Sequence, residues 1–337
     1  MKYSTEKKQM ITLYILEKIS AKTPSLSKSV AETFGISTNT VHSYIKQLVD
    51  EGIIQKQKRG EYELVTSQTE YTFFRSKREL ESDTIAYDLC LSSKIGHLEE
   101  NILHIWSYAL SEMVNNVIDH SSAEVMQITV AQNYLKTYVA IVDNGVGIFE
   151  KIKNHFSLPS LDEAICELFK GKLTTDSANH SGEGIFFTSK MMDAFLISSS
   201  GKIFTTSKYE NDHILDIEDC ENGTCVFMAL SNFTNKTARE IFDLYSDVDG
   251  AFTTTRIPLK NIFDSAPVSR SQAKRVCNRL EQFEEVILDF DGINWMGQGF
   301  AHQMFVVYQK AHPEIAIKAI NMSEGVENMY RHVVSSL

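Results

Sequence analysis

The feature that most constrains the fold is a set of polar segments, two of them rich in glycine, separated by apolar stretches. Three of them follow one another in the middle of the chain: SEMVNNVIDH over residues 111–120, DNGVGI over 143–148 and HSGEGIF over 180–186. The first lies in a run of helical period, the second follows an apolar strand, and the third begins a predicted helix. Each alone is typical of an ordinary turn or surface helix, but their order predicts one composite site.

The first segment places four polar side chains on one face of the predicted helix. Glu112, Asn116, Asp119 and His120 stand at positions i, i+4, i+7 and i+8. The amide oxygen of Asn116 is a hard ligand that suits Mg²⁺. Glu112, one turn earlier, can orient or deprotonate an attacking water. This spacing favours a metal-assisted phosphate site.

The other two segments supply an acceptor and backbone donors. Asp143 ends an apolar strand, where its carboxylate can accept from an adenine amino group. Gly145 and Gly147 let the backbone turn sharply and approach a ligand. Gly182 and Gly184 open a predicted helix, whose N–H groups can hold phosphate oxygens. Further on, Thr224 begins another predicted strand. Its hydroxyl is predicted to complete the part of the site that binds adenine.

Together the three segments resemble the GHKL ATPases (gyrase, heat-shock chaperone, histidine kinase, MutL) over roughly residues 95–232. The resemblance implies a Bergerat-type α/β sandwich that binds ATP and Mg²⁺. It implies that Glu112 is the general base, Asn116 the metal ligand and Asp143 the residue that recognises adenine. Asp119 is also expected to contact the nucleotide. The spacing, with a glutamate four residues before the asparagine, resembles that of gyrase, MutL and the anti-sigma serine kinases.

Residues 149–181 lack a clear strand pattern and are interpreted as a mobile lid over the phosphates. Lys170 and Lys172 flank a glycine in this segment, so we expect them to contact phosphate when the lid closes. The alternative is a solvated loop.

The N-terminal segment shows three short helical periods followed by a hairpin pattern. Gly35 and Ser37 mark a turn before the third helix. Residues 8–65 resemble bacterial winged-helix regulators, and residues 1–66 carry 10 Lys and Arg against 7 Asp and Glu, whereas the rest carries 23 against 37. Any nucleic-acid surface is therefore predicted at this end.

The residues expected to contact duplex DNA fall into two groups. Hydroxyls, amides and one lysine of the third helix suit base edges and phosphates, and the hairpin tip adds cations. The helix residues are Thr38, Asn39, Thr40, His42, Ser43 and Lys46, and the tip residues are Lys56, Lys58 and Arg59. The alternative is a winged helix used for protein contact or dimerisation.

The C-terminal part alternates strands and helices. The stretch VILDFDGINWMGQGF over residues 286–300 resembles a STAS domain, with coverage of about 250–335. Gly297, Gln298 and Gly299 stand where true antagonists carry a phosphorylatable serine. The sequence is therefore closer to the STAS-like domain of unknown function found with winged-helix and GHKL modules. It serves either a protein partner or plain packing.

These observations predict a multidomain α+β protein. The expected parts are a winged helix over 1–66, a linker and helix over 67–95, a GHKL ATP-binding domain over 96–248 and a small STAS-like α/β domain over 249–337. No signal core and no run of about 18 apolar residues occurs, which predicts a soluble cytoplasmic protein without membrane contact. The five cysteines have no metal-ligand spacing.

The function expected from this organisation is ATP-dependent regulation. Binding of Mg²⁺-ATP, with or without slow hydrolysis, would control the DNA-binding winged helix and a partner of the STAS-like domain, and a homodimer is plausible. The alternative is an anti-sigma-type serine/threonine kinase acting on a separate protein. A sensor histidine kinase is a weaker third, because His97 and His104 lack a two-helix dimerisation hairpin.

Overall fold

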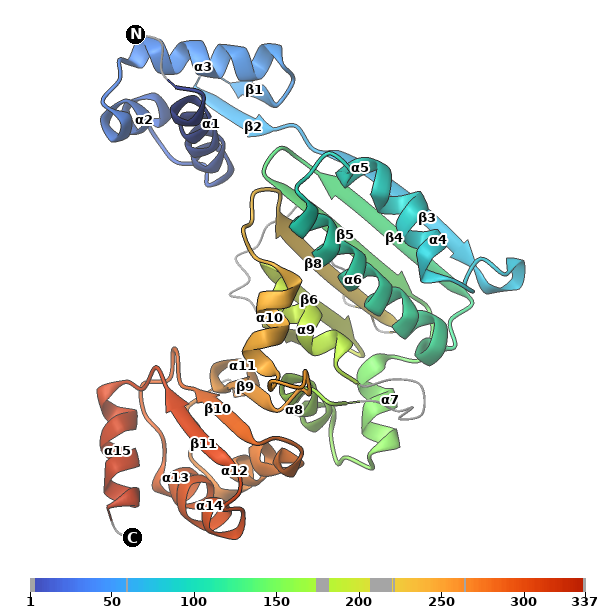
Figure 1. Ribbon diagram of the computed structural model, residues 1–337, viewed down its shortest axis with the longest axis vertical. Helices are drawn as coiled ribbons and strands as arrows, with labels where there is room; N and C mark the ends of the chain where they lie inside the picture. The colour runs from blue at the N-terminus through green and yellow to red at the C-terminus, as the bar shows by residue number, and fades with distance from the viewer. Residues whose placement is uncertain are drawn as a thin grey trace. The chain divides into compact units, whose positions relative to one another are not determined.

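The computed structural model describes residues 4–58, 60–173, 182–206, 220, 222–263 and 265–335 (Figure 1). By their contacts these residues divide into two compact units. The first comprises 1–70 with 129–139 and 229–234, and the second comprises 71–128, 140–228 and 235–337. The second unit holds both the helices of the predicted ATP-binding domain and the C-terminal sheet, so the predicted boundary between 248 and 249 stays a prediction.

The first unit contains the predicted three helices and hairpin. The elements are α1 (Thr5–Ser20), α2 (Leu26–Phe34), α3 (Thr38–Asp50), β1 (Ile54–Lys58) and β2 (Glu61–Leu64). Gly35, at φ 62°, ends α2, and the hydroxyl of Ser37 accepts from the amide of Thr40 to begin α3. β1 and β2 pair antiparallel, with an irregularity between Lys56 and Lys58. This is the winged-helix arrangement that the sequence predicts.

The core of this unit is formed by helix residues three or four apart. Its buried members are Ile11, Ile15, Leu16, Ile19, Leu26, Val30, Val41, Ile45, Leu48, Ile54 and Leu135. Leu135 is distant in sequence and lies in the turn between β4 (Val125–Gln132) and β5 (Lys136–Asp143). The side chain of Asn133 and the backbone of Asn232 hold this turn, because they bond the amide and the carbonyl of Leu135 at 3.0 and 2.8 Å.

The largest sheet has six strands in the order β3-β4-β5-β8-β6-β7. The further strands are β3 (Ser67–Phe74), β6 (Ala194–Ser199), β7 (Lys202–Thr205) and β8 (Thr224–Ser231). In Figure 1, α6 (Glu100–Asn116) and α9 (Gly184–Met191) lie over one face of the sheet. The continuously buried strands β5 and β8 are central, as apolar runs require.

The segment predicted as a linker differs from the expectation. Residues 67–74 form the edge strand β3, in which more exposed and less exposed side chains alternate from Gln68 to Phe73, as is typical of a half-buried strand. A short helical stretch follows: η1 (Arg75–Lys77), α4 (Asp83–Tyr87), the π-helical turn η2 (Asp88–Ser92) and α5 (Ser93–Ile95). The alternation was masked by the many polar residues around it.

Residues 149–173 are also more ordered than the predicted lid. They form α7 (Ile148–His155) and α8 (Leu161–Lys170), and the hydroxyl of Ser160 accepts from the amide of Glu163 to begin α8. Each residue from Ala164 to Lys170 is buried, so α8 is covered on all sides. The rest of the predicted lid, residues 174–181, lies outside the described residues.

The C-terminal domain is built on a three-stranded parallel sheet in the order β11-β10-β9. Its strands are β9 (Thr254–Pro258), β10 (Glu285–Asp289) and β11 (Ala316–Ile320). Helix α10 (Ala238–Tyr245) precedes the domain. The helices of the domain are α11 (Leu259–Ile262), α12 (Arg270–Cys277), η4 (Leu280–Gln282), α13 (Gln298–His302), η5 (Gln303–Tyr308), α14 (Gln309–Ala311) and α15 (Glu324–Val334). Parallel strands joined by helices confirm the predicted α/β alternation. In the ranges that the structure describes, no helix has the length and apolar character needed to cross a membrane.

Candidate nucleotide site and nucleic-acid interface

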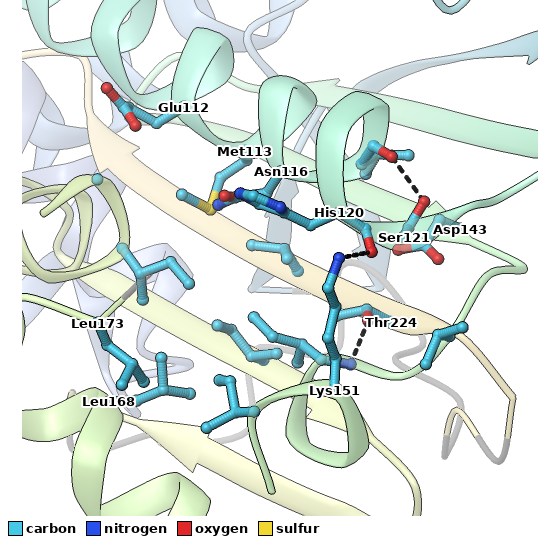
Figure 2. Close-up of a pocket in the computed structure, with 18 of the residues that line it drawn as sticks. Glu112, Met113, Asn116, His120, Ser121, Asp143, Lys151, Leu168, Leu173 and Thr224 are labelled. Carbon is cyan, nitrogen blue, oxygen red and sulfur yellow. Dashed lines mark hydrogen bonds between the residues drawn. The ribbon is translucent and has the colours of Figure 1, made fainter. Parts of the chain in front are cut away.

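Helix α6 presents the first group of predicted site residues. Its apolar side, which includes Trp106, Ala109 and Leu110, is buried in the core. The other side carries Glu112 and Asn116 to the wall of a cavity of about 250 Å³. That volume is near the lower end of the roughly 300–1,000 Å³ of small-molecule sites. Figure 2 shows Glu112, Asn116 and His120 in this order along the helix and the turn that follows it.

The predicted role of Asp119 is not supported, because the helix changes period after Asn116. Residues Val117–Ser121 form a π-helical turn, η3, in which more residues occupy each turn than in an α-helix. His120 and Ser121 consequently line the cavity, while Asp119 is exposed and is not among its lining residues. A strict α-helical count cannot reveal this shift.

Asp143 lies at the end of β5 and forms the opposite part of the cavity wall. It is 5% exposed, and its Oδ1 accepts from the amide of Gly145 at 2.8 Å. Burial raises the pKa of Asp143 to about 6, although backbone hydrogen bonds from Gly145 and Thr224 act against that rise. An ionised carboxylate has about four acceptor positions, so two backbone donors leave capacity for a ligand donor.

Thr224 begins β8, the strand next to β5 in the sheet. Its Oγ1 accepts from the amide of Ile148 at 3.1 Å, the contact drawn in Figure 2. This bond ties the start of α7 to the cavity wall beside Asp143. The predicted neighbourhood of Asp143 and Thr224 is therefore present, and both residues line the cavity.

Two glycines show how closely the site segments approach each other. A β-carbon at Gly184 would collide with the carboxylate of Glu112, which places that carboxylate directly at the start of α9. A β-carbon at Gly223, at φ 84°, would collide with the carbonyl of Asp143. Burial raises the pKa of Tyr108, and the nearby carboxylates of Glu112 and Glu183 add to that rise. The first and third sequence segments thus meet at Glu112.

The remaining predicted glycines take two positions. Gly182 lines the cavity with Gly184, and its backbone carbonyl accepts from the amide of Leu173 at 3.0 Å. Gly145 and Gly147 are not lining residues; they form the turn between Asp143 and α7, close to Ser121 and Ser199 respectively. Their role as backbone supports of a ligand stays a prediction.

Lys151 is a cavity residue that the sequence reasoning missed. It lies in the first turn of α7, and its Nζ donates to the carbonyl of His120 at 2.5 Å (Figure 2). The signal in the sequence is a lysine four residues after Gly147, in the helix that follows the glycine turn. Lys151 brings a cation to the wall that carries Asn116.

The structure assigns Lys170 and Lys172 elsewhere, which corrects the predicted phosphate contacts. Lys170 is 1% exposed and is not a lining residue; its ammonium group donates to Glu167 and to two carbonyls of the C-terminal domain. The Nζ of Lys172 donates to the carbonyl of Gln282 at 2.7 Å. The buried Lys170 ammonium uses all three of its donors and is not available to a phosphate, whereas Lys172 is half-buried and is tied to the C-terminal domain through one bond.

The predicted recognition helix is α3, and its outer face is polar. Thr38, Asn39, His42, Ser43 and Lys46 are all exposed, as contact with base edges and phosphates requires. Thr40 differs, because it is half-buried and its hydroxyl lies 2.9 Å from that of Ser37. Its hydroxyl and its amide both contact the capping residue Ser37 at the start of the helix.

The wing is less basic than its lysines suggest. Lys56 and Lys58 are exposed on β1, but Lys58 lies 3.0 Å from the carboxylate of Glu61 across the hairpin. Glu63 accepts from the side chains of Gln55 and Gln57 on the same hairpin. Arg59 lies outside the described residues. Among the described wing residues, Lys56 is therefore the strongest candidate for a phosphate contact.

The described residues form no cluster of three or more His, Cys, Asp or Glu side chains able to hold a metal ion by themselves. Among the described residues, the five cysteines form no disulfide with one another. A Mg²⁺ ion that takes most of its ligands from phosphate and water needs only one or two protein oxygens, which Asn116 and its surroundings can provide.

Comparison with known families confirms two of the three predicted modules. Residues 27–55 match a winged helix-turn-helix DNA-binding family, and residues 272–327 match the STAS-like domain of unknown function (DUF4325). No curated protein matches the chain. The N-terminal module is therefore a winged helix-turn-helix of the DNA-binding class, and the C-terminal domain is STAS-like, a combination that indicates a regulator.

Proposed function

We propose that this chain is a cytoplasmic DNA-binding regulator whose cavity takes ATP with Mg²⁺. The observation that carries the proposal is the convergence of Glu112, Asn116 and Asp143 on one cavity. These residues come from two of the separated polar segments, and Gly184 brings in the third. A fold that served only packing would have no need to bring these segments together.

The adenine end of the cavity is formed by Asp143 and Thr224. The carboxylate is buried and rigidly held by backbone donors, so it presents a fixed acceptor to an exocyclic amino group. Apolar residues of the wall, including Val146, Ile197 and Val226, supply the flat surfaces that a purine ring requires. Guanine would present a carbonyl oxygen at the same position and would be repelled.

The phosphate end is formed by the start of α9 and by Lys151. The backbone amides that begin α9 are oriented along the helix axis, which favours an anion. Lys151 lies across the cavity on α7 and supplies a positive charge. Both groups act on the triphosphate and not on the base, so adenosine should gain little from them.

Asn116 and Glu112 have distinct roles in this proposal. The amide oxygen of Asn116 would hold Mg²⁺, which when bound neutralises phosphate charge. Glu112, at the start of α9, would orient or accept a proton from a water. Slow hydrolysis is therefore expected, and a binding switch without turnover remains compatible with the same residues.

The proposed link to DNA binding would run through the strand β5. It begins beside Leu135, a member of the winged-helix hydrophobic cluster, and ends at Asp143 in the cavity. A ligand that displaces Asp143 would therefore displace one end of β5, and Leu135, just before the other end, packs in that cluster. Such couplings are typically about 1–3 kcal/mol.

A second candidate function is a serine/threonine kinase of the anti-sigma type, favoured by the STAS-like match. Its substrate would be a separate protein. At the position of the usual phosphoacceptor, a β-carbon on Gly297 would lie 2.5 Å from the carbonyl oxygen of Val268. No hydroxyl-bearing side chain fits at Gly297, so self-phosphorylation there is not expected.

The experiment is a titration of a pooled genomic duplex library with and without a non-hydrolysable ATP analogue at fixed salt. The proposal predicts different affinities in the two states. Identical binding would refute the coupling, and no binding in either state would make the winged helix a protein-contact module. Parallel incubation with γ-labelled ATP separates the enzymatic readings, since free phosphate indicates an ATPase and labelled partner protein a kinase.

A further inference from the structure

Helix α8 forms part of the cavity wall and has a second, polar side. Leu168 and, just after the helix, Leu173 line the cavity. The same turn of the helix also carries Glu167 and Lys170, which are 3% and 1% exposed. Long charged side chains are almost never this deeply buried unless they are paired. The groups that bond to Glu167 and Lys170 therefore determine the position of α8 and of the cavity wall that it forms.

The partners of Lys170 lie at the end of α12 in the C-terminal domain. Its Nζ is 2.7 Å from Glu167 Oε1, 3.1 Å from the carbonyl oxygen of Arg275 and 2.6 Å from that of Asn278. An ammonium group has three donors, and these three acceptors satisfy it completely. In return, the hydroxyl of Thr255 on β9 donates to the carbonyl of Lys170 at 2.7 Å.

Glu167 is held by the same part of the C-terminal domain. The side-chain amide of Asn278 donates to its Oε1 at 2.9 Å, and Nε of Arg279 lies 3.7 Å from its Oε2. The guanidinium of Arg279 also covers the ring of Phe156 at 4.2 Å, just after α7. We call Glu167, Lys170, Asn278 and Arg279 the polar clamp.

The clamp fixes α8 in one position, because its hydrogen bonds are directional, whereas apolar contacts alone would allow the helix to shift. Moving α8 away from the C-terminal domain would leave the Lys170 ammonium without its two carbonyl acceptors and Glu167 without the Asn278 amide, and a buried polar or charged group that loses its partners is costly. Leu168 is next to Glu167 in the chain, so a displacement of the clamp displaces the cavity wall with it. The end of α12 and the segment up to Gln282 are thus positioned to act on the cavity without contacting its ligand.

We propose that the STAS-like domain controls the nucleotide cavity by holding α8 through the polar clamp. The identity of the ligand rests on the proposed function, whereas the attachment of α8 does not. The clamp keeps Leu168 and Leu173 in place and so favours the ligand-binding form of the wall. A protein that binds the STAS-like domain near α12 would change nucleotide affinity by loosening or reinforcing this attachment.

The test is hydrogen exchange of the full-length protein without ligand, read at the amides of residues 161–173. Arg279→Ala removes the guanidinium from Glu167, and Asn278→Ala removes the side-chain amide while leaving every charge in place. The matched control is Lys274→Ala, which removes one exposed cation from α12, just before the clamp residues Asn278 and Arg279. Exchange in 161–173 should become about tenfold faster or more in both clamp variants and stay unchanged in the control.

Affinity for a non-hydrolysable ATP analogue should fall by about 5- to 150-fold in the clamp variants, the usual range of such couplings. Exchange in 161–173 that matches the parent in both variants would overturn the inference. If Arg279→Ala raises exchange throughout the chain, that variant has lost its fold. The result for Asn278→Ala then tests the inference alone. A parent protein that binds no nucleotide would refute the proposed function, while the ligand-free exchange comparison would still decide the clamp.

Discussion

Replacing Asp143 by asparagine should stabilise the ligand-free protein and weaken ATP binding at the same time. Burial raises the pKa of Asp143 from 3.8 to about 6. A group whose pKa is raised in the folded state favours folding below its unfolded pKa, and that contribution is lost as the pH rises through the folded value. At pH 7 the ionised carboxylate therefore costs about 3 kcal/mol, from roughly 2 pKa units at 1.36 kcal/mol each.

The asparagine side chain would avoid this cost because it carries no charge, although its amide hydrogens need partners. We expect Asp143→Asn to raise the free energy of unfolding by about 1–3 kcal/mol at pH 7. The difference from the parent should shrink as the pH falls through 6 and vanish below about 4. The assay is denaturant unfolding of the ligand-free protein at pH 7 and pH 4.

The same change should reduce ATP affinity, since an amide presents a donor where the adenine amino group needs an acceptor. A buried mismatch of this kind costs about 1–3 kcal/mol, measured by calorimetry. Asp243→Asn is the matched control, because Asp243 is exposed on α10 and is paired with Arg239 only at 3.7 Å. A variant that is less stable than the parent at pH 7 and binds ATP equally well would refute the reasoning.

Three further changes test the other groups. Glu112→Gln should lower phosphate release by about 10²–10⁴ while leaving ATP affinity close to that of the parent; equal turnover would move the base elsewhere. Lys151→Met should weaken binding of ATP but not of adenosine in calorimetry, whereas Lys153→Met on the same helix should change neither. Lys56→Ala should weaken binding to every duplex and reduce the salt slope by about one unit; an unchanged slope would remove the wing from the interface.

The helix spacing of the candidate site could be predicted because α6 is regular through Asn116. Glu112 and Asn116 therefore emerge on one side, as the four-residue spacing requires. Asp119 falls in the π-helical turn that follows, where the count of residues per turn changes, and it is exposed and does not line the cavity. Asp143 was predictable for a different reason, since it ends a buried strand and stands before two glycines.

The lysines of the predicted lid show what local sequence does not contain. A lysine beside a glycine is typical of a phosphate loop, yet the carbonyls that bind Lys170 are 105 and 108 residues away in the chain. Contacts of that separation follow from how α8 packs against the C-terminal domain, and no local pattern encodes them. Lys151 was missed for the opposite reason: its segment was interpreted as a loop, so its place on the first turn of a helix was not considered.

The most direct test of the central claim is calorimetric titration of the full-length parent with ATP and Mg²⁺, followed by GTP under the same conditions. Our account predicts saturable binding of one ATP per chain that weakens as the pH falls below about 6, where Asp143 becomes protonated. It also predicts much weaker binding of GTP, because the guanine carbonyl would face the Asp143 carboxylate. The absence of saturable ATP binding, or equal affinities for ATP and GTP, would contradict it.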